Sequence, residues 1–183
     1  MTRAAPQQQQ RIVEARVLST TLILGGARSG KTSHALRLAE ATGQDLVMIA
    51  TAQALDTEME ARIARHRAER GSRWRTLEAP LDLVGALEQI EASQAVVIDC
   101  LTLWVSNLMH AELEVGGEAA RLVSALAGRE VFLVSNELGL GVVPDNALAR
   151  RFRDIAGRLN QQVAAVADKV LFMAAGLPLV LKG

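Results

Sequence analysis

Short apolar runs alternate with longer amphipathic segments along most of the chain. The runs are rich in aliphatic and β-branched residues, which favour extended strands. The predicted strands are Thr21–Leu24, Leu46–Ala50, Trp74–Leu77, Ala95–Ile98, Val131–Val134, Val170–Ala174 and Leu179–Leu181. The segments between the runs repeat their apolar residues with helical spacing. The predicted helices are Gly30–Ala41, Thr57–Arg70, Leu81–Glu91, Thr102–Leu113 and Glu118–Ala127.

A further helix is predicted after Pro144, where the apolar residues repeat most regularly. One face of this helix would carry Leu148, Phe152, Ile155, Leu159, Val163 and Val166. Asp154 lies four residues from both Arg150 and Arg158, so we expect two ion pairs there, which leaves Arg153 without a partner. Most predicted strands are apolar at every position, which is typical of strands that helices cover on both faces. We therefore expect an α/β fold with a largely parallel sheet, helices on both faces and an antiparallel strand pair near the C-terminus.

The length and composition fit one globular domain. The 183 residues are 50% hydrophobic and 22% charged, as in ordinary globular proteins. Residues 1–18 are polar and lack periodicity, so we expect a mobile extension followed by one domain over residues 19–183. No apolar segment has the length of a membrane span or the pattern of a signal peptide, and we expect a cytoplasmic protein. The single cysteine, Cys100, excludes a disulfide within the chain and is expected to be buried.

The charge balance excludes one class of partner. Lys plus Arg and Asp plus Glu number 20 each, and aromatic residues make up 3% of the chain. A neutral chain with few aromatic residues lacks both the field and the stacking surfaces of a strongly basic nucleic-acid binder. The arginines are nevertheless concentrated locally, with six of them between Arg62 and Arg75. That segment is suited to a nucleotide anion although the chain as a whole is neutral.

The clearest motif comes directly after the first predicted strand and leads into a predicted helix. It satisfies the pattern G-x-x-x-x-G-K-[ST] with the residues Gly25, Gly26, Ala27, Arg28, Ser29, Gly30, Lys31 and Thr32. In such a phosphate-binding loop (P-loop), backbone N–H groups wrap a phosphate at a helix N-terminus. Lys31 would then reach the β- and γ-phosphates, and the Thr32 hydroxyl would bind Mg²⁺. The alternative is a glycine-rich turn without a ligand.

Acidic and amide residues at the ends of other predicted strands are further candidates for this site. Asp99 ends the apolar run from Ala95, the position of the Mg²⁺-binding carboxylate in P-loop proteins. We expect Asp99 to hold the ion through a water molecule, and its alternative role is N-cap of the next helix. Asn136 and Glu137 follow another strand and are candidates for contacting substrate or metal, since ligands bind at that sheet edge. Their segment fits a long surface loop equally well.

His66 is a candidate nucleophile. On a helix, Arg62 and Arg70 lie one turn before and one turn after it on the same face. Neighbouring cations keep an imidazole neutral and therefore nucleophilic, and guanidinium groups bind phosphates. Spacing alone favours the plainer alternative, a solvated arginine-rich face with an incidental histidine. His34 and His110 lack a comparable cationic setting.

Several longer segments carry a family resemblance that runs from about Thr21 to the end of the chain. They are GGARSGKT (25–32), IATAQALDTEMEARIARHRAER (49–70), WRTLEAP (74–80), IDCLTLWVSNLM (98–109), SNELGLGVVP (135–144), ARRFRDIAGRLNQ (149–161) and AAGLPLVLKG (174–183). In this order they resemble the bifunctional adenosylcobinamide kinase and adenosylcobinamide-phosphate guanylyltransferase of cobalamin biosynthesis. The P-loop is shared with many families, whereas the other segments are specific to this one.

The resemblance implies a P-loop NTPase-type (RecA-like) fold and two reactions. ATP or GTP phosphorylates the aminopropanol hydroxyl of adenosylcobinamide, and GTP then transfers GMP to adenosylcobinamide phosphate, giving adenosylcobinamide-GDP and pyrophosphate. The family carries the GMP on a histidine in the helix after the second strand, where His66 stands. The resemblance also implies Lys31 and Asp99 as catalytic residues, Mg²⁺ as cofactor, and a homo-oligomer such as a trimer with shared active sites.

Two other functions stay open from the sequence. A P-loop small-molecule kinase with a single activity would use His66 only structurally. A non-catalytic GTP-binding regulatory module would need the P-loop alone. Pyrophosphate release and protein-bound GMP distinguish the bifunctional enzyme from both.

Overall fold

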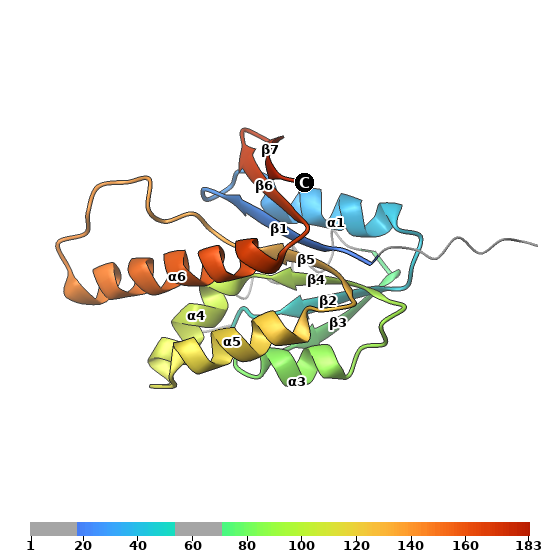
Figure 1. Cartoon of the computed structure of the whole chain (residues 1–183), viewed down its shortest axis with the longest axis horizontal. Helices are drawn as coiled ribbons and strands as arrows, with labels where there is room; N and C mark the ends of the chain where they lie inside the picture. Colours follow the sequence, from blue (N-terminus) through green and yellow to red (C-terminus); the bar gives the residue numbers. More distant parts are fainter. Residues whose placement is uncertain (1–17, 54–70) are drawn as a thin grey trace, which may run out of the picture.

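A computed structural model describes residues 18–53 and 71–183. Within them, seven strands form one sheet in the order β3-β2-β4-β5-β1-β6-β7 (Figure 1). The strands are β1 (Thr20–Gly25), β2 (Leu46–Ala50), β3 (Trp74–Glu78), β4 (Ala95–Asp99), β5 (Glu130–Val134), β6 (Lys169–Ala174) and β7 (Leu177–Lys182). Neighbouring strands are parallel except β6 and β7. The predicted sheet with its antiparallel C-terminal pair is therefore confirmed.

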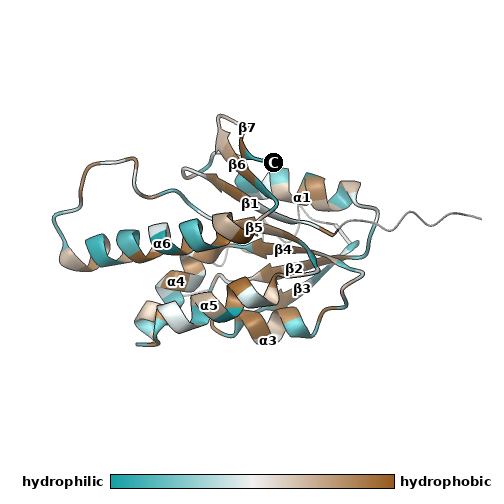
Figure 2. Cartoon of the chain, in the orientation of Figure 1, coloured by the Kyte–Doolittle hydropathy of each residue, from teal (hydrophilic) through white to brown (hydrophobic). Residues whose placement is uncertain are grey.

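Helices cover both faces of the sheet, as the apolar strands predict. They are α1 (Lys31–Ala41), α3 (Leu83–Glu88), α4 (Leu101–His110), α5 (Val115–Ala125) and α6 (Ala147–Val166). Among the described residues, α1 lies on one face and α3 to α6 on the other (Figure 1). Leu22 and Ile23 of β1 show the division, because the first packs in the cluster with α3 to α6 and the second in the cluster with α1. The strands are apolar along most of their length (Figure 2).

Two helices differ from their predicted bounds because side chains cap them. Asp82 caps α3, which is shorter than the predicted segment from Leu81 to Glu91. The carboxylate of Glu114 accepts hydrogen bonds from the first N–H groups of α5, which begins at Val115 rather than at Glu118. Two glycines in the first turn of α5 conceal this start in the sequence, since glycine is a poor helix former.

The polar contacts of α6 differ from the predicted pattern. Asp154 accepts hydrogen bonds from Nε and Nη2 of its neighbour Arg153, at 3.1 and 3.0 Å. Arg150 instead donates to the carbonyl oxygens of Pro144 and Asp145, at 2.8 and 2.6 Å. The expected four-residue ion pairs are therefore wrong, because the loop before the helix offers carbonyl acceptors that spacing does not reveal. The apolar stripe is buried only in its middle, and both of its terminal residues are exposed.

Some expectations concern residues that the structure does not describe. The predicted helix Thr57–Arg70 lies entirely within residues 54–70, and all of the predicted extension, residues 1–18, except its last residue falls in residues 1–17. The division into an extension and one domain therefore stays a prediction. Among the described helices, none combines the length and apolar character needed to cross a membrane.

Candidate functional site

The P-loop joins the end of β1 to the start of α1, and its backbone requires glycine at two motif positions. Gly25 and Gly30 have φ values of +148° and +93°, a region that residues with a Cβ rarely adopt. A Cβ on Gly25 would stand 2.5 Å from the carbonyl oxygen of Met173, and one on Gly30 would stand 3.2 Å from Cα of Gly176. The two glycines therefore allow β6 and the turn after it to approach the loop closely.

Lys31 is buried at the first position of α1 and folds back along its own loop. Its Nζ donates a hydrogen bond to the carbonyl oxygen of Gly26 at 2.6 Å and a longer one to Oγ of Ser29 at 3.5 Å. This places the ammonium group at the N-terminus of α1, where the helix dipole also favours an anion. The lysine is thus held where a bound phosphate would need it.

Thr32 and Asp99 are brought together from segments 67 residues apart. The Thr32 hydroxyl donates to Oδ2 of Asp99 at 3.2 Å. Asp99 is the last residue of β4, and the N-cap of α4 is Cys100 rather than Asp99. The structure therefore assigns the cap to the neighbouring residue and leaves the Asp99 carboxylate beside the P-loop hydroxyl.

Cys100 and Thr51 form a buried junction behind the carboxylate. The Thr51 hydroxyl donates to the carbonyl oxygen of Cys100 and accepts from its N–H, both at 2.8 Å. Asn107 of α4 donates to the carbonyl oxygen of Thr51 at 2.7 Å. Burial raises the pKa of the Cys100 thiol to about 11, so this cysteine is neutral and structural, as expected. The sequence shows no signal for Thr51, because its partner is 49 residues away.

Asn136 and Glu137 lie beside the P-loop because the chain after β5 continues along β1. The Glu137 N–H donates to the carbonyl oxygen of Gly25 at 3.1 Å. The Asn136 N–H donates to Oγ1 of Thr102 at 2.7 Å, and its carbonyl oxygen accepts from Asn160 at 3.2 Å. The segment is therefore tied to β1, α4 and α6 at its start. Thr102 and Asn160 are positioning residues that the sequence patterns do not single out.

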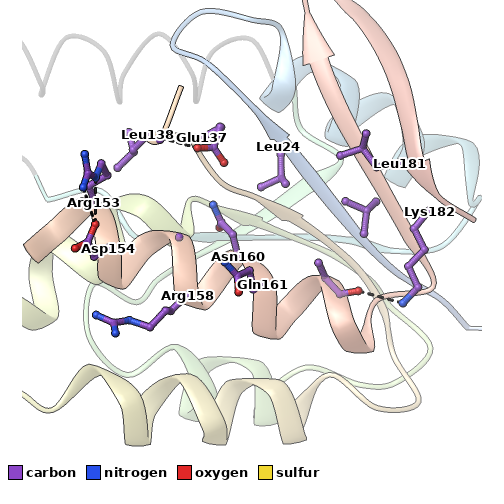
Figure 3. Close-up of a pocket in the computed structure, with 14 residues that line it drawn as sticks. Leu24, Glu137, Leu138, Arg153, Asp154, Arg158, Asn160, Gln161, Leu181 and Lys182 are labelled. Carbon is purple, nitrogen blue, oxygen red and sulfur yellow. Dashed lines mark hydrogen bonds and ion pairs between the residues drawn. The ribbon is translucent and has the colours of Figure 1, made fainter. Parts of the chain in front are cut away.

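An open cavity of about 700 Å³ extends from Glu137 along α6 toward the end of β7 (Figure 3). Its wall on the β-sheet side includes Leu24 and Leu181. Its α6 side presents Arg153, Asp154, Arg158, Asn160 and Gln161. The cavity therefore combines an apolar wall with amide and charged groups, and one end of it reaches the segment beside the P-loop.

The three histidines have different settings. His66 lies outside the described residues, as do Arg62 and Arg70, so their arrangement stays a prediction. Nδ1 of His34 accepts a hydrogen bond from Nη2 of Arg37 at 3.0 Å, and desolvation together with that guanidinium lowers the pKa of the imidazole. His110 donates from Nδ1 to the carbonyl oxygen of Ser106 at 2.7 Å near the end of α4. In the described residues no group of three or more His, Cys, Asp or Glu side chains could hold a metal ion by itself.

The P-loop between β1 and α1, together with the strand order of the sheet, defines a P-loop protein with a RecA-like fold. Solved structures with the same fold agree. The RadB recombinase superposes with a TM-score of 0.51 at 17% identity, covering 84% of this chain and 73% of that one. The flagellar accessory protein FlaH from Methanocaldococcus jannaschii has a TM-score of 0.51 at 13% identity, covering 90% and 78%. These likenesses concern the fold alone.

Within that class, the chain belongs to the cobinamide kinase / cobinamide phosphate guanyltransferase family, which its residues 21–181 match. The bifunctional adenosylcobalamin biosynthesis protein CobP of Pseudomonas aeruginosa is 51% identical over 168 residues, covering 88% of this chain and 96% of the relative. The protein CobU of Escherichia coli K12, of the same description, is 39% identical over 179 residues, covering 88% and 98%. The resemblance seen in the sequence segments is confirmed.

Proposed function

We propose that this protein phosphorylates adenosylcobinamide with ATP or GTP and then transfers GMP from GTP to the product, forming adenosylcobinamide-GDP and pyrophosphate. The Thr32–Asp99 hydrogen bond beside a buried Lys31 is the observation that carries the proposal, because it assembles the parts of a phosphoryl-transfer site. Family membership supplies the substrate class.

The phosphoryl-transfer step rests on positioning and charge neutralisation. The P-loop N–H groups and Lys31 hold the β- and γ-phosphates of the nucleotide. The hydroxyl oxygen of the substrate forms a bond to the γ-phosphorus and loses its proton to water, while the bond from that phosphorus to the β,γ-bridging oxygen breaks and the nucleoside diphosphate leaves. Asn136 and Glu137, tied to Gly25 through the Glu137 N–H, contact the substrate as it approaches this phosphate.

The Thr32–Asp99 pair fits Mg²⁺. A hydroxyl and a carboxylate oxygen 3.2 Å apart are the hard oxygen donors that this ion prefers. Thr32 would bind the ion directly and Asp99 through a water molecule, with phosphate oxygens completing the set. Bound there, the ion supplies charge neutralisation for the transferred phosphoryl group.

The guanylyl transfer uses His66. A neutral imidazole nitrogen forms a bond to the α-phosphorus of GTP, and the bond to pyrophosphate breaks. Arg62 and Arg70 neutralise the phosphates during this step. The phosphate of adenosylcobinamide phosphate then attacks the same phosphorus and releases the imidazole. The helical spacing of the two arginines around His66 supports these roles, together with the family's use of a histidine at this place.

The decisive experiment follows the α-phosphate of GTP. Incubating the protein with α-labelled GTP and Mg²⁺ should leave acid-labile label on the protein, and His66→Ala should abolish that label while sparing cobinamide phosphorylation. His110→Ala is the matched control, since its Nδ1 is engaged with Ser106 near the end of α4. The control should be labelled like the wild type.

Absence of protein-bound label in the wild type would contradict the histidine role. Accumulation of adenosylcobinamide phosphate with excess GTP would then indicate a kinase with a single activity. If labelling persists in His66→Ala, another nucleophile carries the GMP, and His66 is structural.

We also propose that the enzyme is a homo-oligomer such as a trimer. The edge strand β7 exposes the aliphatic residues Leu177, Leu179, Val180 and Leu181, and exposed apolar edges of this kind mark contact surfaces. Light scattering should give a mass that is a multiple of the 19.6 kDa chain. If the active sites are shared, the specific activity should fall on dilution. A monomeric mass with undiminished activity would refute this part.

A further inference from the structure

The loop between β5 and α6 is held at both ends by hydrogen bonds, and its start lies beside the P-loop. At its start, the Glu137 N–H donates to the carbonyl oxygen of Gly25 at 3.1 Å. At its end, Arg150 donates to the carbonyl oxygens of Pro144 and Asp145 at 2.8 and 2.6 Å. The stretch between these anchors projects beyond the edge of the sheet (Figure 1). The loop therefore starts beside the phosphoryl-transfer site and extends from there to the N-terminal end of α6.

The middle of the loop carries aliphatic side chains into solvent. Leu140 is 80% exposed, Val142 96% and Val143 62%. Figure 2 shows apolar stretches in this loop. A single exposed aliphatic residue is ordinary, but three within four residues at a ligand-binding sheet edge form a patch. Such a patch gains free energy when an apolar surface covers it.

The patch adjoins the polar cavity along α6. Leu138 and Gly139, directly before the exposed residues, line that cavity (Figure 3). Asn160 on the opposite wall is 6% exposed, and its Oδ1 has no hydrogen-bond partner among the described residues. An amide oxygen without a partner in a buried position costs free energy. Loop and cavity together thus present an apolar surface next to a recess lined by amide and charged groups, in which the buried Asn160 Oδ1 lacks a donor from the described part of the chain.

We propose that Leu138–Val143 and the adjoining cavity form the corrinoid subsite. The inference rests on the proposed function, since it assigns where that reaction's substrate docks. A corrin macrocycle has apolar faces and a rim of primary carboxamides. One face covers Leu140 and Val142, and rim carboxamides hydrogen-bond to the amide and charged groups of the cavity. The hydroxyl-bearing arm then extends from the loop toward the P-loop, to which Glu137 ties the loop.

The size of the patch favours this ligand over another protein chain. Stable protein interfaces bury about 800 Å² on each partner, far more than three aliphatic side chains offer. Three aliphatic side chains are, however, enough to cover one face of a macrocycle. The polar groups of the cavity also suit a ligand whose rim carries both hydrogen-bond donors and acceptors.

The test replaces aliphatic side chains that make no core contacts. In the Leu140→Ser/Val142→Ser double variant, the Kd for cobinamide should rise at least about tenfold, or about 1.4 kcal/mol. Equilibrium dialysis with a non-hydrolysable GTP analogue present measures this Kd through the visible absorbance of the corrinoid. The Kd for the nucleotide and the melting temperature should stay unchanged. Val166→Ser, which alters an exposed valine at the far end of α6, should leave every value unchanged.

An unchanged Kd for cobinamide in a folded double variant overturns the inference. If the double variant melts early, Val142→Ser alone replaces it, since that side chain is almost wholly in solvent. A change of oligomeric mass with unaltered cobinamide binding shows a subunit contact and also overturns it. Wild-type turnover separates the two proposals. If the wild type turns over its substrates and the double variant binds cobinamide with an unchanged Kd, only the subsite is refuted. If the wild type shows no turnover but the double variant binds cobinamide more weakly, only the proposed function is refuted.

Discussion

Gly25→Ala tests whether packing against β6 shapes the P-loop. A Cβ at this position would stand 2.5 Å from the carbonyl oxygen of Met173 and 2.8 Å from Oγ of Ser29. The first contact is with the backbone of a paired strand, which cannot rotate away as a flexible side chain would. The φ of +148° adds backbone strain, because an alanine rarely adopts it.

The two effects set the magnitude. Overpacking in a well-packed region costs about 1–3 kcal/mol, and a strained backbone conformation costs a further ~1–3 kcal/mol. We therefore expect Gly25→Ala to lower the free energy of unfolding by about 2–5 kcal/mol, a large part of a typical domain's stability. If the loop shifts to relieve the contact, the free energy of unfolding falls less and nucleotide affinity falls instead.

Gly26→Ala is the matched control in the same loop. A Cβ on Gly26 has nothing within 4 Å, its φ is not positive, and the motif admits any residue there. We expect its free energy of unfolding to change by less than about 1 kcal/mol. Urea unfolding gives the stability of each variant, and titration with GTP gives its affinity. If Gly25→Ala matches Gly26→Ala in both measurements, the packing argument is wrong.

Two further predictions concern the carboxylate and the thiol at the start of α4. Asp99→Asn should lower kcat for phosphoryl transfer about a hundredfold and weaken its dependence on Mg²⁺. The free energy of unfolding should change by less than about 1 kcal/mol, because the amide oxygen of the variant still accepts a hydrogen bond from Thr32. If kcat depends on the Mg²⁺ concentration as it does in the wild type, Asp99 does not help to bind the ion. Burial raises the pKa of the Cys100 thiol from 9.0 to about 11. Between these pH values the unfolded state binds fewer protons than the folded state, so the free energy of unfolding falls as the pH rises, by about 2 kcal/mol. Cys100→Ala should show a smaller decline in urea unfolding between these pH values, and parallel curves would disprove the linkage.

Several features of the fold could be predicted from the sequence because they depend on local patterns. Strands β1, β2, β4 and β5 were predicted almost to the residue, since a run of apolar positions is typical of a strand covered on both faces. The P-loop was also predictable, because its glycines and lysine occupy consecutive positions of one motif. Helix starts were less predictable, as α5 shows, because a capping side chain outweighs the low helix propensity of the glycines that follow it.

Other features depend on residues that are distant in sequence. Whether Asp99 caps α4 or meets Thr32 could not be decided from spacing, because the answer depends on which strands lie between β1 and β4. The partner of Asp154 could not be predicted either. Spacing favours Arg150, but the carbonyl groups of the preceding loop hold that guanidinium and leave the carboxylate to Arg153.

Local periodicity and contiguous motifs are enough to predict the class of protein, the order of its strands and helices along the chain, and the family. The order of the strands within the sheet, the carboxylate that faces the P-loop and the position of the aliphatic loop beside the cavity follow only from the fold. These features arise from the parallel alignment of strand ends and from hydrogen bonds between segments far apart in the chain, which no local pattern records. A pattern in the sequence records which groups are present, whereas the fold determines which of them meet.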